Sequence, residues 1–239
     1  MKRREELGDS GVHGYGKRLS ESKEGLQRNG GLTDLPAQPV LLNMQKALHE
    51  LSDSEFVREG LPGPLFDQAL GLRDNIPTLV EAAVKLPATV AHNDCHIRNL
   101  FASSTDVENP EIVAIDFAQV GVEFIGVDGG SLFGSGFLWT DDEASGLMDV
   151  ADDFYSAWLD GLKSAGWAEA DEIARLGFLV PLLRCTIEVA GMMAFVSQGR
   201  EFPLQRFGGV KEDMPASFRK RFEFLLPLCD KAAVLSGQI

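Results

Sequence analysis

The feature that most constrains this chain is a set of two carboxylates and a carboxamide placed at the ends of short apolar segments. Asp94 and Asn99 lie in the stretch His-Asn-Asp-Cys-His-Ile-Arg-Asn, and Asp116 follows 22 residues after Asp94, at the end of the apolar run Ile-Val-Ala-Ile. Apolar runs of this length are typical of short strands. Phosphoryl transfer to a hydroxyl needs one carboxylate to orient the hydroxyl, and an Asn and an Asp to hold Mg²⁺. The sequence therefore predicts such a site between Asp94 and Asp116.

These residues resemble the catalytic loop of the aminoglycoside phosphotransferase and choline kinase-like family. That family has the pattern His-x-Asp-x-x-x-x-Asn, followed by a strand that ends in Ile-Asp-Trp or Ile-Asp-Phe. His92, Asp94 and Asn99 match the first part of the pattern, and Asp116-Phe117 matches the second. Polar residues also terminate ordinary strands, but matches in this order and spacing favour the family's loop.

The resemblance implies a role for each matched residue. Asp94 would be the catalytic base, or would orient the acceptor hydroxyl, and Asn99 and Asp116 would bind Mg²⁺. His92 and Arg98 are assigned to the cofactor side of the site. His92 would act mainly by anchoring the loop through a ring hydrogen bond, and Arg98 would contact a phosphate, with a solvated Arg as the alternative.

Two neighbouring positions extend the resemblance. His96 falls where many members carry a second His, although a loop His of this kind is often incidental. Gly126-Val127-Asp128 resembles the family's Gly-x-Asp segment. The carboxylate of Asp128 is therefore expected to fix the catalytic loop by accepting backbone N–H groups.

The expected fold class is α+β and mostly helical, a protein-kinase-like C-terminal lobe with a small β-hairpin region that carries the catalytic loop. Residues 1–40, rich in Gly and charge, are expected to form a flexible arm, a linker or a remnant of an N-terminal lobe. Residues 41–239 would form the kinase-like lobe, with the catalytic loop in 90–130 and a helical bundle in 140–235.

The pattern of apolar residues predicts the individual elements. Helices are expected over 41–52, 64–72, 77–86, 141–165, 170–198 (as one helix or two, kinked near Pro181) and 215–235, and strands over 88–91, 99–102 and 111–116, with a turn at Asn109-Pro110.

The β-rich N-terminal lobe of the family's enzymes does not fit into the forty or so residues before Leu41. That lobe normally supplies the Lys–Glu pair that positions the phosphates. The segment Gly11–Lys17 fits Gly-x-x-x-x-Gly-Lys, but it is followed by Arg18 and is preceded by a polar stretch. It is therefore interpreted as a chance match to a phosphate-binding loop.

Composition limits the partners. The chain has 22 basic and 36 acidic residues, a net charge of −14. Such a protein repels nucleic acid and anionic membranes and attracts small cations. We expect no membrane span and no secretory signal, because the chain lacks a long uncharged run and an apolar N-terminal segment. The three cysteines, at positions 95, 185 and 229, form no Cys-x-x-Cys pair and indicate reduced thiols in the cytoplasm.

Three functions follow from these residues. The first is an ATP- or GTP-dependent, Mg²⁺-dependent phosphotransferase that acts on the hydroxyl of a small molecule, such as an aminoglycoside-like or other cationic amino alcohol. The second is a catalytically impaired or non-catalytic kinase-like binding protein that lacks the nucleotide lobe. The third is a metal-dependent hydrolase in which His92, Asp94, His96 and Asp116 gather Zn²⁺ or Mn²⁺, which leaves Asn99 without a role.

Overall fold

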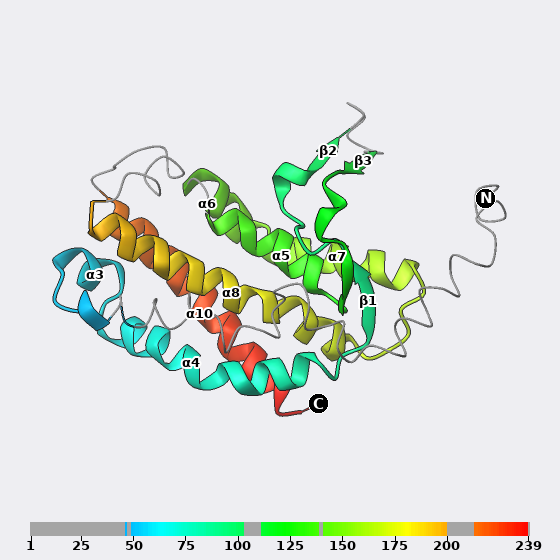
Figure 1. Ribbon diagram of the computed structural model, residues 1–239, viewed down its shortest axis with the longest axis horizontal. Helices are drawn as coiled ribbons and strands as arrows, with labels where there is room; N and C mark the ends of the chain where they lie inside the picture. The colour runs from blue at the N-terminus through cyan, green and yellow to red at the C-terminus, as the bar shows by residue number, and fades with distance from the viewer. Residues whose placement is uncertain (1–45, 47–48, 103–110, 139–140, 200–212, 239) are drawn as a thin grey trace.

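The computed structural model describes residues 46, 49–102, 111–138, 141–199 and 213–238 (Figure 1). The helices are α3 (Glu55–Gly60), α4 (Gly63–Ala83), α5 (Val127–Ser135), α6 (Asp141–Asp149), α7 (Ala151–Ser164), α8 (Asp171–Ser197) and α10 (Met214–Ser236). The strands are β1 (Ala88–Ala91), β2 (Leu100–Ala102), β3 (Ile112–Ala114) and β4 (Gly121–Phe124), and short 3-10 helices cover η3 (Ile97–Asn99), η4 (Phe117–Gln119) and η5 (Gly136–Leu138).

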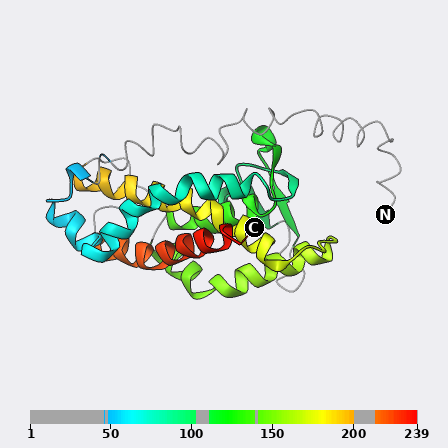
Figure 2. The ribbon, with the colours of Figure 1, turned by 90° about the horizontal axis from the view of Figure 1, so that it is seen from below.

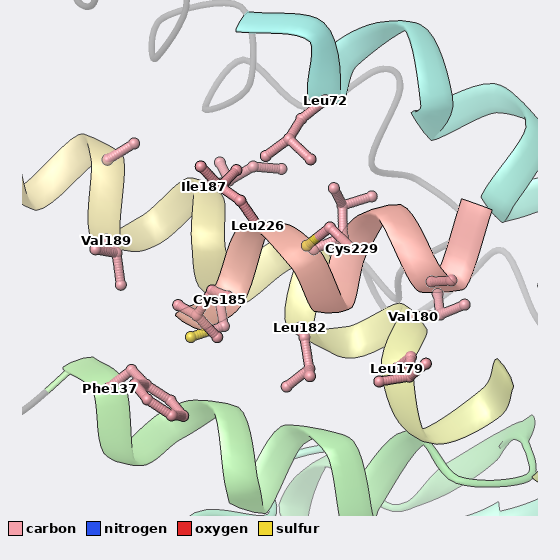
Figure 3. Close-up of a cluster of buried hydrophobic side chains, with 14 of the residues drawn as sticks. Leu72, Phe137, Leu179, Val180, Leu182, Cys185, Ile187, Val189, Leu226 and Cys229 are labelled. Carbon is pink, nitrogen blue, oxygen red and sulfur yellow. The ribbon is translucent and has the colours of Figure 1, made fainter. Parts of the chain in front are cut away.

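The core is built around α8. Figures 1 and 2 show α4, α8 and α10 side by side, and α5 packs on α8 as well. Residues all round α8 are buried, as expected for a helix with neighbours on several sides. Figure 3 shows Leu182 and Cys185 directed from α8 toward α5 and Phe137, with Leu226 and Cys229 of α10 in the same cluster.

By length and composition, α8 is long and apolar enough to cross a membrane. In its most apolar 18-residue window, however, 72% of the residues are buried inside the protein. The core helix of a folded domain meets the same criterion, and the packing of α8 against α5 and α10 accounts for its apolar surface.

The four strands form two antiparallel pairs. β1 pairs with β4, with Ala88 opposite Phe124, and β2 pairs with β3, with Leu100 opposite Ala114. The chain passes from β1 through η3 into β2, so the residues between them form a loop at the junction of both pairs.

Glycines allow α5 to approach α8 closely. Gly126, which precedes α5 at φ 94°, has no room for a side chain, because a Cβ there would lie 2.5 Å from the carbonyl carbon of Gly177. A Cβ at Gly130 would overlap the carbonyl oxygen of Phe178. The start of α5 is thus fixed against α8, and this fixes the position of Asp128.

The described residues confirm the α+β, mostly helical class. The strands expected over 88–91, 99–102 and 111–116 are confirmed in β1, β2 and β3, and the helices expected over 170–198 and 215–235 are confirmed in α8 and α10. The expected arm over 1–40 and the expected turn at Asn109-Pro110 lie outside the described residues. Of the expected helix over 41–52, only Lys46, His49 and Glu50 are described as helical.

Three expectations are wrong in detail. The two helices expected over 64–72 and 77–86 are the single helix α4, which continues through Pro77 because buried Ile76 and Leu79 hold it against the core. The helix expected over 141–165 is broken at Val150, which has non-helical dihedral angles (φ −109°, ψ 13°). Strand β4 was not predicted, since Glu123, which is buried, interrupts its apolar residues.

Candidate active site

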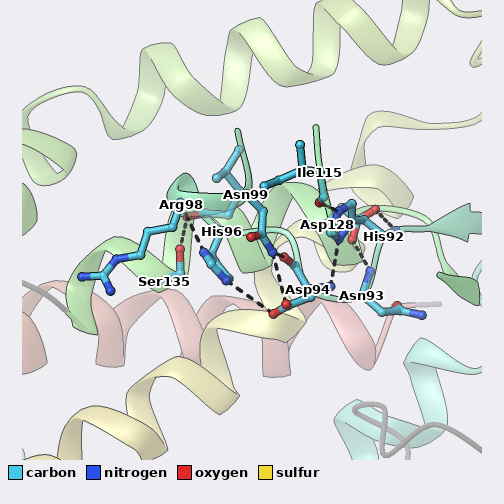
Figure 4. A network of polar contacts seen from close by, with 10 residues as sticks. His92, Asn93, Asp94, His96, Arg98, Asn99, Ile115, Asp128 and Ser135 are labelled. Carbon is cyan, nitrogen blue, oxygen red and sulfur yellow. Dashed lines mark hydrogen bonds and ion pairs between the residues drawn. The ribbon is translucent and has the colours of Figure 1, made fainter. Parts of the chain in front are cut away.

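Helix α5 holds the loop that follows β1 in place. In the first turn of α5, the carboxylate of Asp128 accepts hydrogen bonds from the backbone N–H groups of His92 (2.7 Å) and Asn93 (3.0 Å) (Figure 4). Asn93 has a positive φ of 63°, a conformation that Asn tolerates better than most residues. The expectation that Asp128 fixes this loop through backbone N–H groups is confirmed.

His92 joins the loop to the end of β3. Its side chain is buried, Nε2 lies 2.7 Å from the carbonyl oxygen of Ile115, and Nδ1 accepts a hydrogen bond from the backbone N–H of Asp94 (3.3 Å). A ring that accepts at Nδ1 and meets a carbonyl at Nε2 carries its proton on Nε2. The face of the ring also packs on Phe117, with 4.8 Å between ring centroids. The expected anchoring bond of His92 is confirmed, and its place on the cofactor side stays a prediction.

Asp94 and Asn99 are in direct contact. The amide nitrogen of Asn99 donates to the backbone carbonyl of Asp94 (2.9 Å) and to its carboxylate oxygen Oδ2 (3.2 Å). Asn99 is 7% exposed, whereas the side chain of Asp94 is 43% exposed. Because the amide N–H groups are directed at Asp94, the Oδ1 atom of Asn99 is left as an acceptor for a cation.

The residue before Asp116, Ile115, is bonded to the loop through its backbone. The backbone N–H of Ile115 donates to the carbonyl of Asn99 (3.0 Å), while the carbonyl of Ile115 meets His92. Asp116 is the next residue in the chain; it is exposed and has the left-handed backbone conformation (φ 61°, ψ 58°). The left-handed conformation costs about 1–3 kcal/mol for a residue other than glycine, and residues in this conformation concentrate at functional sites.

His96 and Arg98 flank the pair. His96 Nε2 lies 3.6 Å from Asp94 Oδ1, an ion pair only when the imidazole is protonated, and Nδ1 accepts from the backbone N–H of Arg98 (3.3 Å). The side chain of Arg98 is exposed and extends away from Asp94 and Asn99 in Figure 4. The contact of Arg98 with a phosphate stays a prediction.

A cavity of about 160 Å³ opens beside Asp94, between the loop, α5 and α8. Its polar wall is formed by Asn93, Asp94, His96, Ser131, Ser135, Arg184 and Glu188, and its thiols are those of Cys95 and Cys185. Arg184 and Glu188 form an ion pair, with 2.9 Å between Nε and Oε1. Sequence analysis missed the residues from α5 and α8, and the only signal was the spacing of four residues between Arg184 and Glu188.

The two thiols of the cavity are held in their neutral forms. Burial, followed by the negative charges of Asp128 and Asp94, raises the pKa of Cys95 from 9.0 to about 11. Burial also raises the pKa of Cys185, whose thiol donates to the carbonyl of Gly134 (2.8 Å). Neither group is a thiolate near neutral pH, so neither is a ready nucleophile or metal ligand.

The remaining donors suit a hard cation better than zinc. In the part of the chain that is described, no three His, Cys, Asp or Glu side chains gather as a metal-binding group. His92 has both ring nitrogens engaged within the protein, so it is not available to Zn²⁺. The carboxylate of Asp116 and the Oδ1 atom of Asn99 are oxygen donors, the type that Mg²⁺ prefers.

Exposed apolar side chains surround the loop, with exposed fractions between 41% and 58%. They are Val90, Ile97, Phe101, Ile112, Val113, Ile115, Phe117 and Val120. They belong to β1, η3, the β2–β3 pair and the segment after β3. Exposed apolar side chains on adjoining segments are typical of an interaction surface.

The chain matches no protein-family model, no curated protein and no solved structure. The case for a function therefore depends on the geometry of the loop and on the residues that carry the resemblance.

Proposed function

We propose that this chain is a phosphotransferase of the aminoglycoside phosphotransferase-like kind, which transfers a phosphoryl group from ATP or GTP to the hydroxyl of a small molecule. The observation that supports it most is the direct pairing of Asn99 with Asp94 on a loop held by His92 and Asp128. A loop held in this way would keep a base and a metal ligand side by side before any substrate binds, and such preorganisation is how phosphoryl transfer is accelerated.

Asp94 acts on the acceptor. Its partly exposed carboxylate faces the cavity, where it accepts a hydrogen bond from the acceptor hydroxyl. A new bond then joins the hydroxyl oxygen to the γ-phosphorus, while the bond from that phosphorus to the β–γ bridging oxygen breaks. The nucleoside diphosphate leaves with the bonding electrons, and the hydroxyl proton passes to Asp94 and then to water.

Asn99 and Asp116 complete the site. The Oδ1 atom of Asn99 and the carboxylate of Asp116 would hold Mg²⁺, which supplies positive charge against the phosphate oxygens. His92 and Asp128 are positioning residues, since each acts through the loop backbone. Arg98 and His96 would stand near the phosphates.

The same proposal covers the fold and location. The order of the described elements (helices, a strand pair that carries the loop, then a helical bundle) supports a protein-kinase-like C-terminal lobe. Reduced cysteines support a cytosolic protein, and the acidic charge supports a small, neutral or cationic acceptor, with no nucleic-acid or membrane partner.

One observation favours a second function, that of a kinase-like protein without catalysis or one that needs a separate nucleotide-binding layer. The exposed apolar side chains near the loop, such as Phe101 and Phe117, support this, because a separate layer would bury apolar surface of this kind. Calorimetry with Mg-ATP separates the two functions. Micromolar binding by the chain alone supports the transferase, and the absence of binding supports the second function.

The transferase proposal is tested by phosphoryl transfer from Mg-ATP and Mg-GTP to a panel of small amino alcohols. Asp94→Asn keeps the size of the side chain and removes the base, so turnover is expected to fall by about 10²–10⁴-fold. Asp152→Asn is the matched control, because Asp152 is an exposed carboxylate on α7. Equal turnover in the wild type and Asp94→Asn would remove the assignment.

A further inference from the structure

The cavity beside Asp94 carries opposite charges on one wall. Arg184 and Glu188 lie one turn apart on α8, and both line the cavity together with Asp94. We propose that this wall recognises a small zwitterion, and that the acceptor of the proposed transferase is a hydroxy amino acid. The inference rests on the proposed function for its reaction, but the binding site stands on its own geometry.

The ion pair leaves donors and acceptors for a ligand. Arg184 meets Glu188 through Nε, with Oε1 as its partner. A guanidinium has two further nitrogens, which suit a carboxylate in two-point contact. Glu188 keeps Oε2 for an ammonium group. A zwitterion therefore satisfies both side chains without breaking their bond, whereas a lone cation or a lone anion satisfies only one.

The volume limits the ligand. A cavity of about 150 Å³ accepts a molecule the size of benzene, with its six carbon atoms, so about 160 Å³ suits roughly six to eight non-hydrogen atoms. L-Serine, L-threonine and L-homoserine are of this size, and an aminoglycoside is several times larger. The hydroxyls of Ser131 and Ser135 add polar contacts, and Ser135 already donates to the carbonyl of Leu132 (2.8 Å), which leaves its oxygen as an acceptor.

The hydroxyl of such a ligand is directed toward the loop. With the ammonium and carboxylate groups at Glu188 and Arg184 on α8, the side-chain end of the amino acid would extend toward the loop, whose Asp94 also lines the cavity. The transfer then forms the bond between the side-chain oxygen and the γ-phosphorus, releases the nucleoside diphosphate, and passes the hydroxyl proton to Asp94. The product is an O-phospho amino acid.

The test is calorimetric binding of L-serine, L-threonine and L-homoserine to the full chain without nucleotide. Ethanolamine serves as the cation without a carboxylate, 3-hydroxypropionate as the anion without an ammonium group, and kanamycin as a large acceptor. We expect at least one amino acid to bind at least tenfold more tightly than ethanolamine and 3-hydroxypropionate. Arg184→Gln and Glu188→Gln should each weaken that binding at least tenfold.

Glu81→Gln is the matched control, because Glu81, near the end of α4, forms an exposed ion pair with Lys85 four residues further along the chain. It should leave binding unchanged. Equal binding of ethanolamine and the amino acids, unchanged affinity in Arg184→Gln, or binding of kanamycin alone would each overturn the inference. If the amino acids bind but no Mg-ATP-dependent phosphorylation follows, the proposed function fails and the site remains. If phosphorylation of another acceptor is found without amino-acid binding, the function stands and this inference fails.

Discussion

The hydrogen bonds from the loop to Asp128 give the sharpest structural prediction. Replacing Asp128 by Asn keeps the shape of the side chain but turns one of its two acceptor oxygens into an NH₂ donor. The backbone N–H groups of His92 and Asn93, now bonded at 2.7 and 3.0 Å, cannot both be satisfied. One charge-assisted bond becomes neutral, and the other N–H faces a second donor.

The cost follows from these two bonds. Hydrogen bonds to charged groups contribute about 1.5–3 kcal/mol and neutral ones about 1 kcal/mol. Both bonds are only partly buried, so each is taken at about 1.5–2 kcal/mol; weakening one and losing the other then costs about 2–3 kcal/mol, or about 30- to 150-fold in the equilibrium for opening of the loop. If the free energy of unfolding of the whole domain falls by this amount, its Tm falls by about 4–12 °C.

Hydrogen exchange measures this cost directly. In Asp128→Asn, the amides of His92 and Asn93 should exchange about 30- to 150-fold faster than in the wild type, while amides in the middle of α8 change only as far as global stability falls. Asp160→Asn, an exposed carboxylate on α7, should leave both the exchange and the Tm unchanged. Exchange of His92 and Asn93 that stays within threefold of the wild type would refute the role given to Asp128.

Three further predictions concern packing, pH and the exposed surface. Gly130→Ala, which sets a Cβ against a backbone carbonyl of α8, should lower the free energy of unfolding by about 2–3 kcal/mol in urea titrations. Gly161→Ala on α7, with open space around it, should raise the free energy of unfolding by up to about 1 kcal/mol. Equal effects of the two substitutions would contradict the close approach of α5 to α8. Burial and nearby carboxylates raise the pKa of Cys95 from 9.0 to about 11, so the stability that the neutral thiol contributes is full below pH 9 and is lost as the pH rises through 11. Cys95→Ala should reduce this loss of stability at alkaline pH. An unchanged dependence of stability on pH in the variant would contradict the prediction. The double variant Phe101→Ser, Ile112→Ser should self-associate less than the wild type in sedimentation runs at several concentrations. It should lose little stability, because these two side chains are 50% and 57% exposed. A wild type that is monomeric at all concentrations would show that this surface does not drive association.

Sequence patterns predicted the elements whose burial is simple. The last helix was predicted because Phe218 and Phe222 recur at helical spacing on its buried face. The continuity of α4 through Pro77 could not be predicted, because packing of the residues on either side outweighs the local cost of the proline, and no local sequence pattern shows that packing.

The loop was predictable and the cavity was not. The contacts of His92 and Asp128 were expected because the loop and the Gly-x-Asp segment resemble those of a known family. Arg184 and Glu188 lie in the mostly apolar middle of α8, and their pairing is the ordinary pattern of an exposed helix face. Only the packing of α5 on α8 brings them to the side of Asp94.

The central claim is that Asn99 and Asp116 hold a divalent cation beside Asp94. A crystal structure of the chain with Mn²⁺ in place of Mg²⁺ and a non-hydrolysable ATP analogue, with the metal located by its anomalous scattering, tests it most directly. We predict a metal bound by Asn99 Oδ1 and the Asp116 carboxylate at about 2.0–2.2 Å, close to the ideal for such hard cations. Metal and nucleotide bound elsewhere, with Asn99 and Asp116 outside the coordination sphere, would contradict the account.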